Sequence, residues 1–171
     1  MWILIRACGL IGLILCIIPF QFKKHKHIVL CKMTSELTFA VQYLLLGAYT
    51  GAFVDLVSGI RNFLYHKFVE KGKSTTPLII VFSLFIIAIA VGSWDGPISL
   101  LPMAAKVITT VSYGMKSEKL LRYITLPSCL CWIAYNIVIG AWEGMIADSL
   151  AFVSILIAIY KFDIRKTKAQ D

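Results

Sequence analysis

Several ionisable side chains stand inside long apolar stretches of this chain, where an unpaired charge is costly. Asp55, Asp148, Lys106, Glu36 and Arg61 each lie within or against such a stretch. Ionisable residues within hydrocarbon are rare, face a bundle interior or a water-filled cavity, and mark the paths of solutes, ions or protons. These residue types therefore predict binding or proton exchange inside a membrane rather than covalent chemistry.

Counting along a helix places four of these side chains at one depth. Asp55 lies eight residues beyond Gly47, which corresponds to about 12 Å at the helical rise. Lys106 and Asp148 lie at a matching distance from the loops that precede them, and Glu36 approaches the same level from the opposite end. We therefore expect Asp55, Asp148, Lys106 and Glu36 near the middle of the membrane.

Each charge also has a purely structural explanation. Lys106 needs an acid partner, because an unpaired ammonium in hydrocarbon is strongly penalised, and the two aspartates are the candidates. Glu36 stands one turn from Lys32 and is expected to pair with it. Arg61, closer to the cytoplasmic side, is long enough to reach the membrane surface. The sequence leaves open whether Lys106 and the aspartates form a binding site or a structural pair.

Polar and aromatic residues recur at helical spacing around these charges. Positions three, four and seven apart share one helix face, so Asp55 lies on the same face as Asn62, and Trp132 on that of Asn136. Such faces, turned inward, would line a polar cavity with aromatic walls. The alternative is that they join helices by interhelical hydrogen bonds. The predicted solute pathway comprises Asp55, Asp148, Lys106, Asn62, Trp132, Asn136, Gln42 and Arg61.

The elements that must position these residues are transmembrane helices. Of the 171 residues 59% are hydrophobic, and the mean hydropathy is +0.83, whereas a soluble domain averages about 45–50% apolar. Only helices or closed barrels satisfy the backbone in lipid, and apolar runs this long are typical of helices. We expect an all-α polytopic membrane protein with seven helices, over residues 2–20, 28–46, 48–68, 77–91, 98–114, 120–139 and 141–160.

Basic residues occupy every second segment between the apolar runs. The loops around residues 47–48, 93–97 and 140–144 contain no Lys or Arg, whereas basic residues occur within residues 23–26, 67–73, 116–122 and 161–168. The positive-inside rule assigns the basic segments to the cytoplasm, so the N-terminus is expected outside and the C-terminus in the cytoplasm. The net charge of +8 arises from these segments, and we expect a lipid bilayer and no nucleic acid as partner.

An internal repeat emerges when the sequence is shifted by 93 residues, which carries Gly47 onto Gly140. The pattern Gly-Ala-aromatic-x-Gly-x-x-x-Asp then occurs at 47–55 and again at 140–148. Because three helices is an odd number, a linking helix makes the two units parallel, related by an axis along the membrane normal. The predicted parts are a first unit at residues 1–68, a loop and linker helix at 69–93, a second unit at 94–162 and a basic cytoplasmic tail at 163–171.

Four segments carry a resemblance to a known family: Leu100-Leu101-Pro102, Cys131-Trp132-x-x-Tyr135-Asn136, residues 140–148 and residues 47–61. They resemble the YgjV-type family of small bacterial inner-membrane proteins, over nearly the whole chain. The resemblance implies an inner-membrane location and a shared architecture, but no substrate. More distantly, the plan of three, one and three helices is similar to the SWEET, PQ-loop and vitamin-carrier group, although this chain has no Pro-Gln dipeptide.

No residue pattern typical of an enzyme occurs. The three histidines lie in basic segments, and Cys129-x-Cys131 lacks partner ligands at zinc spacing, so we expect no catalytic site, no metal and no cofactor. One function that fits is a facilitator or secondary carrier for a small polar metabolite, with alternating access between two parallel units. The alternative is a non-transporting accessory, sensor or immunity-type protein that uses the bundle as an interaction surface. The sequence identifies neither solute nor coupling ion, and leaves a homo-oligomer open.

Overall fold

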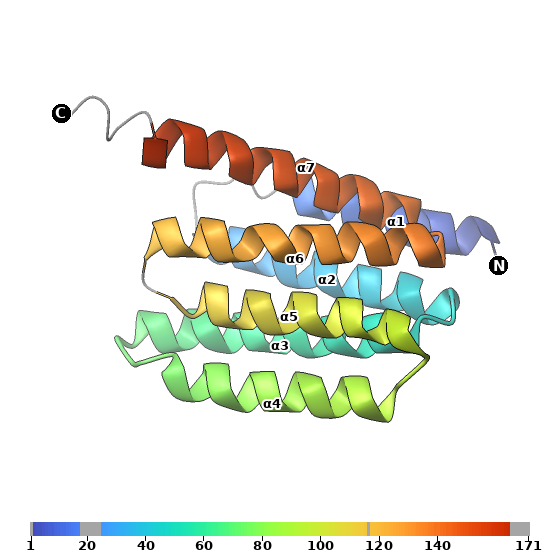
Figure 1. Ribbon diagram of the computed structural model, residues 1–171, viewed down its shortest axis with the longest axis horizontal. Helices are drawn as coiled ribbons and strands as arrows, with labels where there is room; N and C mark the ends of the chain where they lie inside the picture. The colour runs from blue at the N-terminus through green and yellow to red at the C-terminus, as the bar shows by residue number, and fades with distance from the viewer. Residues whose placement is uncertain (1, 18–24, 116, 165–171) are drawn as a thin grey trace.

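The chain is helical throughout the part that the structure describes. The computed structural model describes residues 2–17, 25–115 and 117–164, and no strand occurs in these ranges. A 3-10 turn at Pro97–Ser99 precedes α5, and a π-helical turn at Ile159–Ile164 follows α7. The seven α-helices of the described residues are α1 (Trp2–Ile17), α2 (His25–Leu45), α3 (Tyr49–Glu70), α4 (Thr76–Gly92), α5 (Leu100–Tyr113), α6 (Glu118–Ile139) and α7 (Trp142–Ala158) (Figure 1). The all-α prediction is therefore confirmed.

Six of these helices pack in a closed ring. α1 packs against α2, α2 against α3, α3 against α5, α5 against α6, α6 against α7, and α7 returns to α1. The remaining helix, α4, lies outside the ring against α3 and α5, and it forms one edge of the bundle in Figure 1. It buries Phe82, Ile86 and Ala90 against these two helices. The ring therefore has an interior to which α4 contributes no face.

Two glycines form the tight turns of the ring. Gly47 has φ 74° between α2 and α3, and Gly140 has φ 71° between α6 and α7. This left-handed conformation is routine for glycine and strained for other residues. After each turn the chain makes the same closing bond: Ala48 N–H donates to Tyr43 O at 2.8 Å, and Ala141 N–H donates to Asn136 O at 2.9 Å. The repeated glycine pattern thus corresponds to two turns of one geometry.

Burial in this bundle is inverted relative to a soluble protein. Its most buried side chains include Arg61, Gln42 and Asn136, whereas Val81, Leu84 and Ile157 are exposed. In soluble proteins large aliphatic residues are usually inside, and arginine almost never is unless paired. An apolar exterior over a polar interior is the arrangement expected of helices surrounded by lipid.

Length and composition identify only some of the helices as membrane spans. Among the described residues, Lys119–Ile139 and Trp142–Lys161 are long and apolar enough to cross a membrane, and the apolar helices Trp2–Cys16 and Thr76–Gly92 are shorter. The other three helices carry Glu36, Asp55, Arg61 and Lys106 within their length, and these charges lower their hydropathy. The count of seven spans therefore stays a prediction.

The two ends of the bundle have different surfaces. Tyr49, Trp94 and Trp142 are about half exposed at the end where α3 and α7 begin. Exposed lysines mark the opposite end, where α3 and α5 finish and α6 begins: Lys67, Lys71, Lys73 and Lys119. Aromatic residues favour membrane interfaces. We refer to these as the aromatic end and the basic end.

Candidate functional site

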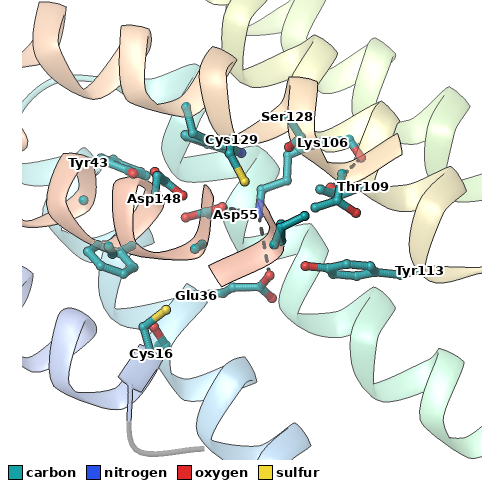
Figure 2. Close-up of a pocket in the computed structure, with 18 residues that line it drawn as sticks. Cys16, Glu36, Tyr43, Asp55, Lys106, Thr109, Tyr113, Ser128, Cys129 and Asp148 are labelled. Atoms are coloured by element: carbon teal, nitrogen blue, oxygen red, sulfur yellow. Dashed lines mark hydrogen bonds and ion pairs between the residues drawn. The ribbon is translucent and has the colours of Figure 1, made fainter. Parts of the chain in front are cut away.

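A cavity of about 460 Å³ lies inside the six-helix ring. Its walls combine aromatic, charged and small polar side chains, and it extends further toward the basic end than toward the aromatic end, since it reaches Tyr113 late in α5 and Ile155 late in α7. The charged residues that line it are Glu36, Asp55, Lys106 and Asp148, and the aromatic ones are Phe39, Tyr43, Tyr113 and Trp132. Figure 2 shows Lys106 extending toward the carboxylates from one wall.

Lys106 is held by carboxylates of two neighbouring helices. Its Nζ lies 2.6 Å from Asp55 Oδ1 on α3 and 3.6 Å from Glu36 Oε1 on α2. The same ammonium lies 5.1 Å from the centre of the Trp132 ring, a distance typical of a cation–π contact. Of the two aspartates predicted as partners, Asp55 is the one that pairs with Lys106. We call Glu36, Asp55 and Lys106 the central cluster.

Glu36 faces the ring interior and not the membrane surface. Its Oε2 accepts a hydrogen bond from Asn62 Nδ2 at 2.8 Å. The predicted Lys32 partner lies outside the described side chains. Both carboxylate oxygens of Glu36 therefore have a partner within the ring, Lys106 for one and Asn62 for the other.

Arg61 is fully buried, so the expectation that it reaches the membrane surface is wrong. Its side chain is 0% exposed. Its guanidinium donates to Thr110 Oγ1 at 2.5 Å and to Asn62 Oδ1 at 2.9 and 3.2 Å. It also lies 5.6 Å from the Tyr113 ring centre. These contacts direct the arginine toward α5. Arg61 does not line the cavity, but it is linked to the central cluster through Asn62.

Asp148 also lines the cavity, but its partner is an amide and not Lys106. Its Oδ2 accepts a hydrogen bond from Asn136 Nδ2 at 2.8 Å, and Asn136 Oδ1 accepts one from the Tyr43 hydroxyl at 2.9 Å. Gly144 gives Asn136 room, because a Cβ there would lie 2.9 Å from its Nδ2. In Figure 2, Asp148 lies beside Tyr43, and Asp55 lies between Asp148 and Lys106 in that view.

Stacked aromatic rings form part of the cavity wall, and their contacts continue toward the aromatic end. Tyr43 stacks on Trp132 with ring centres 5.8 Å apart and on Phe39 at 6.3 Å. Tyr135, one turn nearer the aromatic end than Trp132, meets both Tyr43 and Trp132 edge-on and accepts a hydrogen bond from Gly51 N–H at 3.2 Å. The aromatic layer separates the central cluster from a second polar group.

That second group, which we call the outer cluster, comprises Arg6, Gln42 and Glu143. Arg6 Nη1 lies 3.1 Å from Glu143 Oε2, and Gln42 Nε2 donates to the same oxygen at 2.9 Å. Glu143 is largely buried in the first turn of α7. The sequence places residue 143 in the outer segment 140–144, which has no Lys or Arg, and predicts no partner for its carboxylate. An acid in the first turn of a helix is the signal that could have indicated a partnered position.

The eight residues of the predicted pathway divide into two sets. Asp55, Asp148, Lys106 and Trp132 line the cavity, whereas Asn62, Asn136, Gln42 and Arg61 are absent from its lining. Asn62 and Asn136 each hold a cavity carboxylate, Arg61 supports Asn62, and Gln42 belongs to the outer cluster. Tyr43, Phe39 and Cys16 also line the cavity and were not predicted, because each resembles an ordinary apolar residue of a membrane helix.

An apolar exterior, a polar interior and partnered charges around a central cavity define a helical membrane protein. Residues 3–166 match the model of the Imp-YgjV family, described as a bacterial inner membrane protein. The chain belongs to this family, which confirms both the resemblance noted in the sequence and the inner-membrane location. No curated protein and no solved structure matches the chain significantly.

Proposed function

We propose that this protein is a facilitator or secondary carrier for a small polar solute that binds in the central cavity. The observation that carries the proposal is the cavity of about 460 Å³ with the partnered charges of the central cluster on its wall. Solute sites are typically concavities of about 300–1,000 Å³ with a few placed polar groups on largely apolar walls. Charges at membrane depth are retained at a cost, which favours a functional role.

The proposal includes two related units, residues 1–68 and 94–162, arranged in parallel. Ser35 Oγ donates to Gly12 O at 2.8 Å, and 93 residues further along Ser128 Oγ donates to Ala105 O at 3.0 Å. The order of helices around the ring supports the same relation, since shifting α1, α2 and α3 onto α5, α6 and α7 reproduces every neighbour pair of the ring. In this arrangement α4 serves as the linker.

Two sets of ion pairs join the two units, and in alternating access such contacts would break and re-form. Lys106 of the second unit pairs with Asp55 and Glu36 of the first, and Arg6 of the first pairs with Glu143 of the second. Rocking of one unit against the other would open the aromatic end only after the outer cluster and the Tyr43–Asn136 bond separate. We infer that the structure corresponds to a conformation closed at the aromatic end.

The proposed topology has seven spans, with the N-terminus outside and the C-terminus in the cytoplasm. The exposed lysines at one end and half-exposed aromatic residues at the other support this orientation. Reporter fusions at residue 171 and at Asp95 test it. A periplasm-specific reporter is expected to be active at Asp95 and inactive at the tail, and the reverse pattern would exclude the topology.

Transport itself is tested on the purified protein. Thermal stability in detergent is first screened against amines, amino acids, sugars and carboxylates, and any stabilising compound is then assayed for counterflow in proteoliposomes. Uptake is expected with the wild type and not with the paired variant Lys106→Met/Asp55→Leu, provided that this variant folds. Full uptake by the folded paired variant would exclude a functional central cluster. A protein that takes up none of these compounds would instead favour the accessory function.

A further inference from the structure

Asp148 and Asp55 occupy equivalent positions in the two predicted units but have different partners. The Asp55 carboxylate lies 2.6 Å from the Lys106 ammonium. Asp148 accepts a hydrogen bond from Asn136, and within the described residues no Lys, Arg or His nitrogen lies within ion-pair distance of it. Of the three carboxylates that line the cavity, Glu36 and Asp55 share Lys106, and Arg61 donates to Thr110 and Asn62 instead of to an acid. Asp148 is therefore the carboxylate without a cation of its own.

The sequence supplies a reason for this difference. The position that Lys106 holds in the second unit is held by Leu13 in the first. Leu13 packs on the apolar core and cannot donate to a carboxylate. The chain thus provides an ammonium for one of the two equivalent aspartates and a methyl-bearing side chain for the other.

The wall around Asp148 is suited to an ammonium group. Lys106 illustrates the arrangement, because its Nζ contacts a carboxylate and lies 5.1 Å from the Trp132 ring centre. Phe39 takes the place of Trp132 in the other unit and lines the same cavity, and Tyr43 stacks on both rings. Aromatic faces attract alkylammonium cations, and quaternary ammonium ligands are recognised by such walls.

We infer that the cavity binds a small organic monocation whose ammonium group is held by Asp148 against the Phe39 and Tyr43 rings. This inference rests on the proposed function, since it names the solute class of the same cavity. A free anion would meet three carboxylates and a lysine that two of them already engage. A hard metal cation requires about six oxygen ligands, whereas the described residues contain no group of three or more His, Cys, Asp or Glu side chains that could hold a metal ion.

The test compares two ligands of the same shape on the wild-type protein. Choline and its neutral isostere dimethylbutanol are titrated by calorimetry in detergent, with sodium chloride added to equalise ionic strength. Choline is expected to bind and the isostere to bind at least about tenfold more weakly, because only the cation gains a charge-assisted contact. Equal binding of the two, or binding of sodium alone, would overturn the inference.

Two variants test whether the carboxylate of Asp148 is the group that binds choline. Asp148→Asn keeps the shape and is expected to weaken choline binding by about tenfold to a hundredfold, whereas Asp95→Asn, at an exposed acid in the loop before α5, leaves binding unchanged. If Asp148→Asn does not fold, Asp148→Glu retains the charge and is expected to retain the preference for choline over the isostere. Undiminished binding by folded Asp148→Asn, or loss of the preference in Asp148→Glu, would contradict the assignment.

The outcome separates this inference from the function on which it rests. Uptake of a neutral or anionic solute that depends on Lys106 and Asp55, with no choline binding, would remove the cation assignment and leave a carrier. Absence of both uptake and binding would remove both.

Discussion

The central and outer clusters both pair a cation with a carboxylate, but they differ in packing. Each pairs a cation with an acid across the two predicted units, Lys106 with Asp55 and Arg6 with Glu143. The central cluster borders a cavity of about 460 Å³. The outer cluster is tightly packed, since a Cβ on Gly9 would lie 2.4 Å from Gln42 Nε2 and 2.8 Å from Glu143 Oε2. Both clusters therefore contain a cation–carboxylate pair, but only the central pair has open space beside it.

This difference separates two roles that a buried ion pair can have. An ion pair beside a cavity can exchange a partner for a solute or a proton without moving the backbone. One surrounded by close contacts can separate only when the helices that carry it move apart. The central cluster is thus suited to binding, and the outer cluster to holding one end of the bundle closed.

The largest expected effect follows from breaking the central cluster. Lys106→Met leaves two buried carboxylates without their cation, and removing one partner of a buried pair costs about 3–5 kcal/mol of stability. Lys106→Met/Asp55→Leu removes both charges and is expected to recover most of this loss. Thermal and denaturant unfolding in detergent measure the difference. A paired variant no more stable than Lys106→Met alone would show that the ion pair is not the cause.

The packing contrast can be tested with two glycines of α3. A Cβ on Gly51 would lie 2.7 Å from the Tyr135 ring and hydroxyl, whereas on Gly59 the nearest atom is Met33 Cγ at 3.6 Å. Gly51→Ala is therefore expected to destabilise the protein by about 1–3 kcal/mol through overpacking. Gly59→Ala is the matched control and should stabilise by about 0.5–1 kcal/mol. Equal effects at the two positions would argue against a tightly packed aromatic end.

A smaller loss is expected from the outer cluster. Arg6→Met removes the cation from Glu143, but Gln42 still donates to that carboxylate, and the side chains of Arg6 and Glu143 retain 21% and 10% exposure. The expected cost is about 1 kcal/mol, in the range of a single hydrogen bond. Denaturant unfolding of Arg6→Met and Lys106→Met under the same conditions compares the two losses of unfolding free energy. A loss as large as that of Lys106→Met would mean that the two clusters are equally isolated from water.

The smallest effect concerns the basic end. Arg122 donates to both Asp163 oxygens, at 2.6 and 3.0 Å, and this bond lowers the pKa of the Asp163 carboxyl below its usual range. A lowered folded pKa contributes stability that is present above the unfolded value of about 3.9 and is lost as the pH falls through the folded value. Protease sensitivity after α7 should therefore rise below about pH 4. Arg122→Gln should remove this dependence, and a pH profile identical to that of the wild type would contradict it.

The sequence by itself determined the helical class and the level of the charges. Hydropathy is a local property, so the seven apolar runs predicted the seven helices of the described residues within a few positions at their ends. Spacing along a helix is equally local, and it predicted that Lys106 would meet an acid at its own depth. The sequence pattern also repeated a glycine at 47 and 140, where the structure has two turns of one geometry, because a left-handed backbone strongly favours that residue.

Only the tertiary structure decided which groups meet. Asp55 rather than Asp148 holds Lys106, Arg61 is buried rather than at the membrane surface, and Glu143 lies in a packed cluster. Each of these outcomes depends on how far a helix is rotated about its axis and which helix stands beside it. The rotation of each helix and the identity of its neighbours are set by packing around the closed ring. When several possible partners lie at one depth, nothing in the local sequence indicates which of them a side chain will contact.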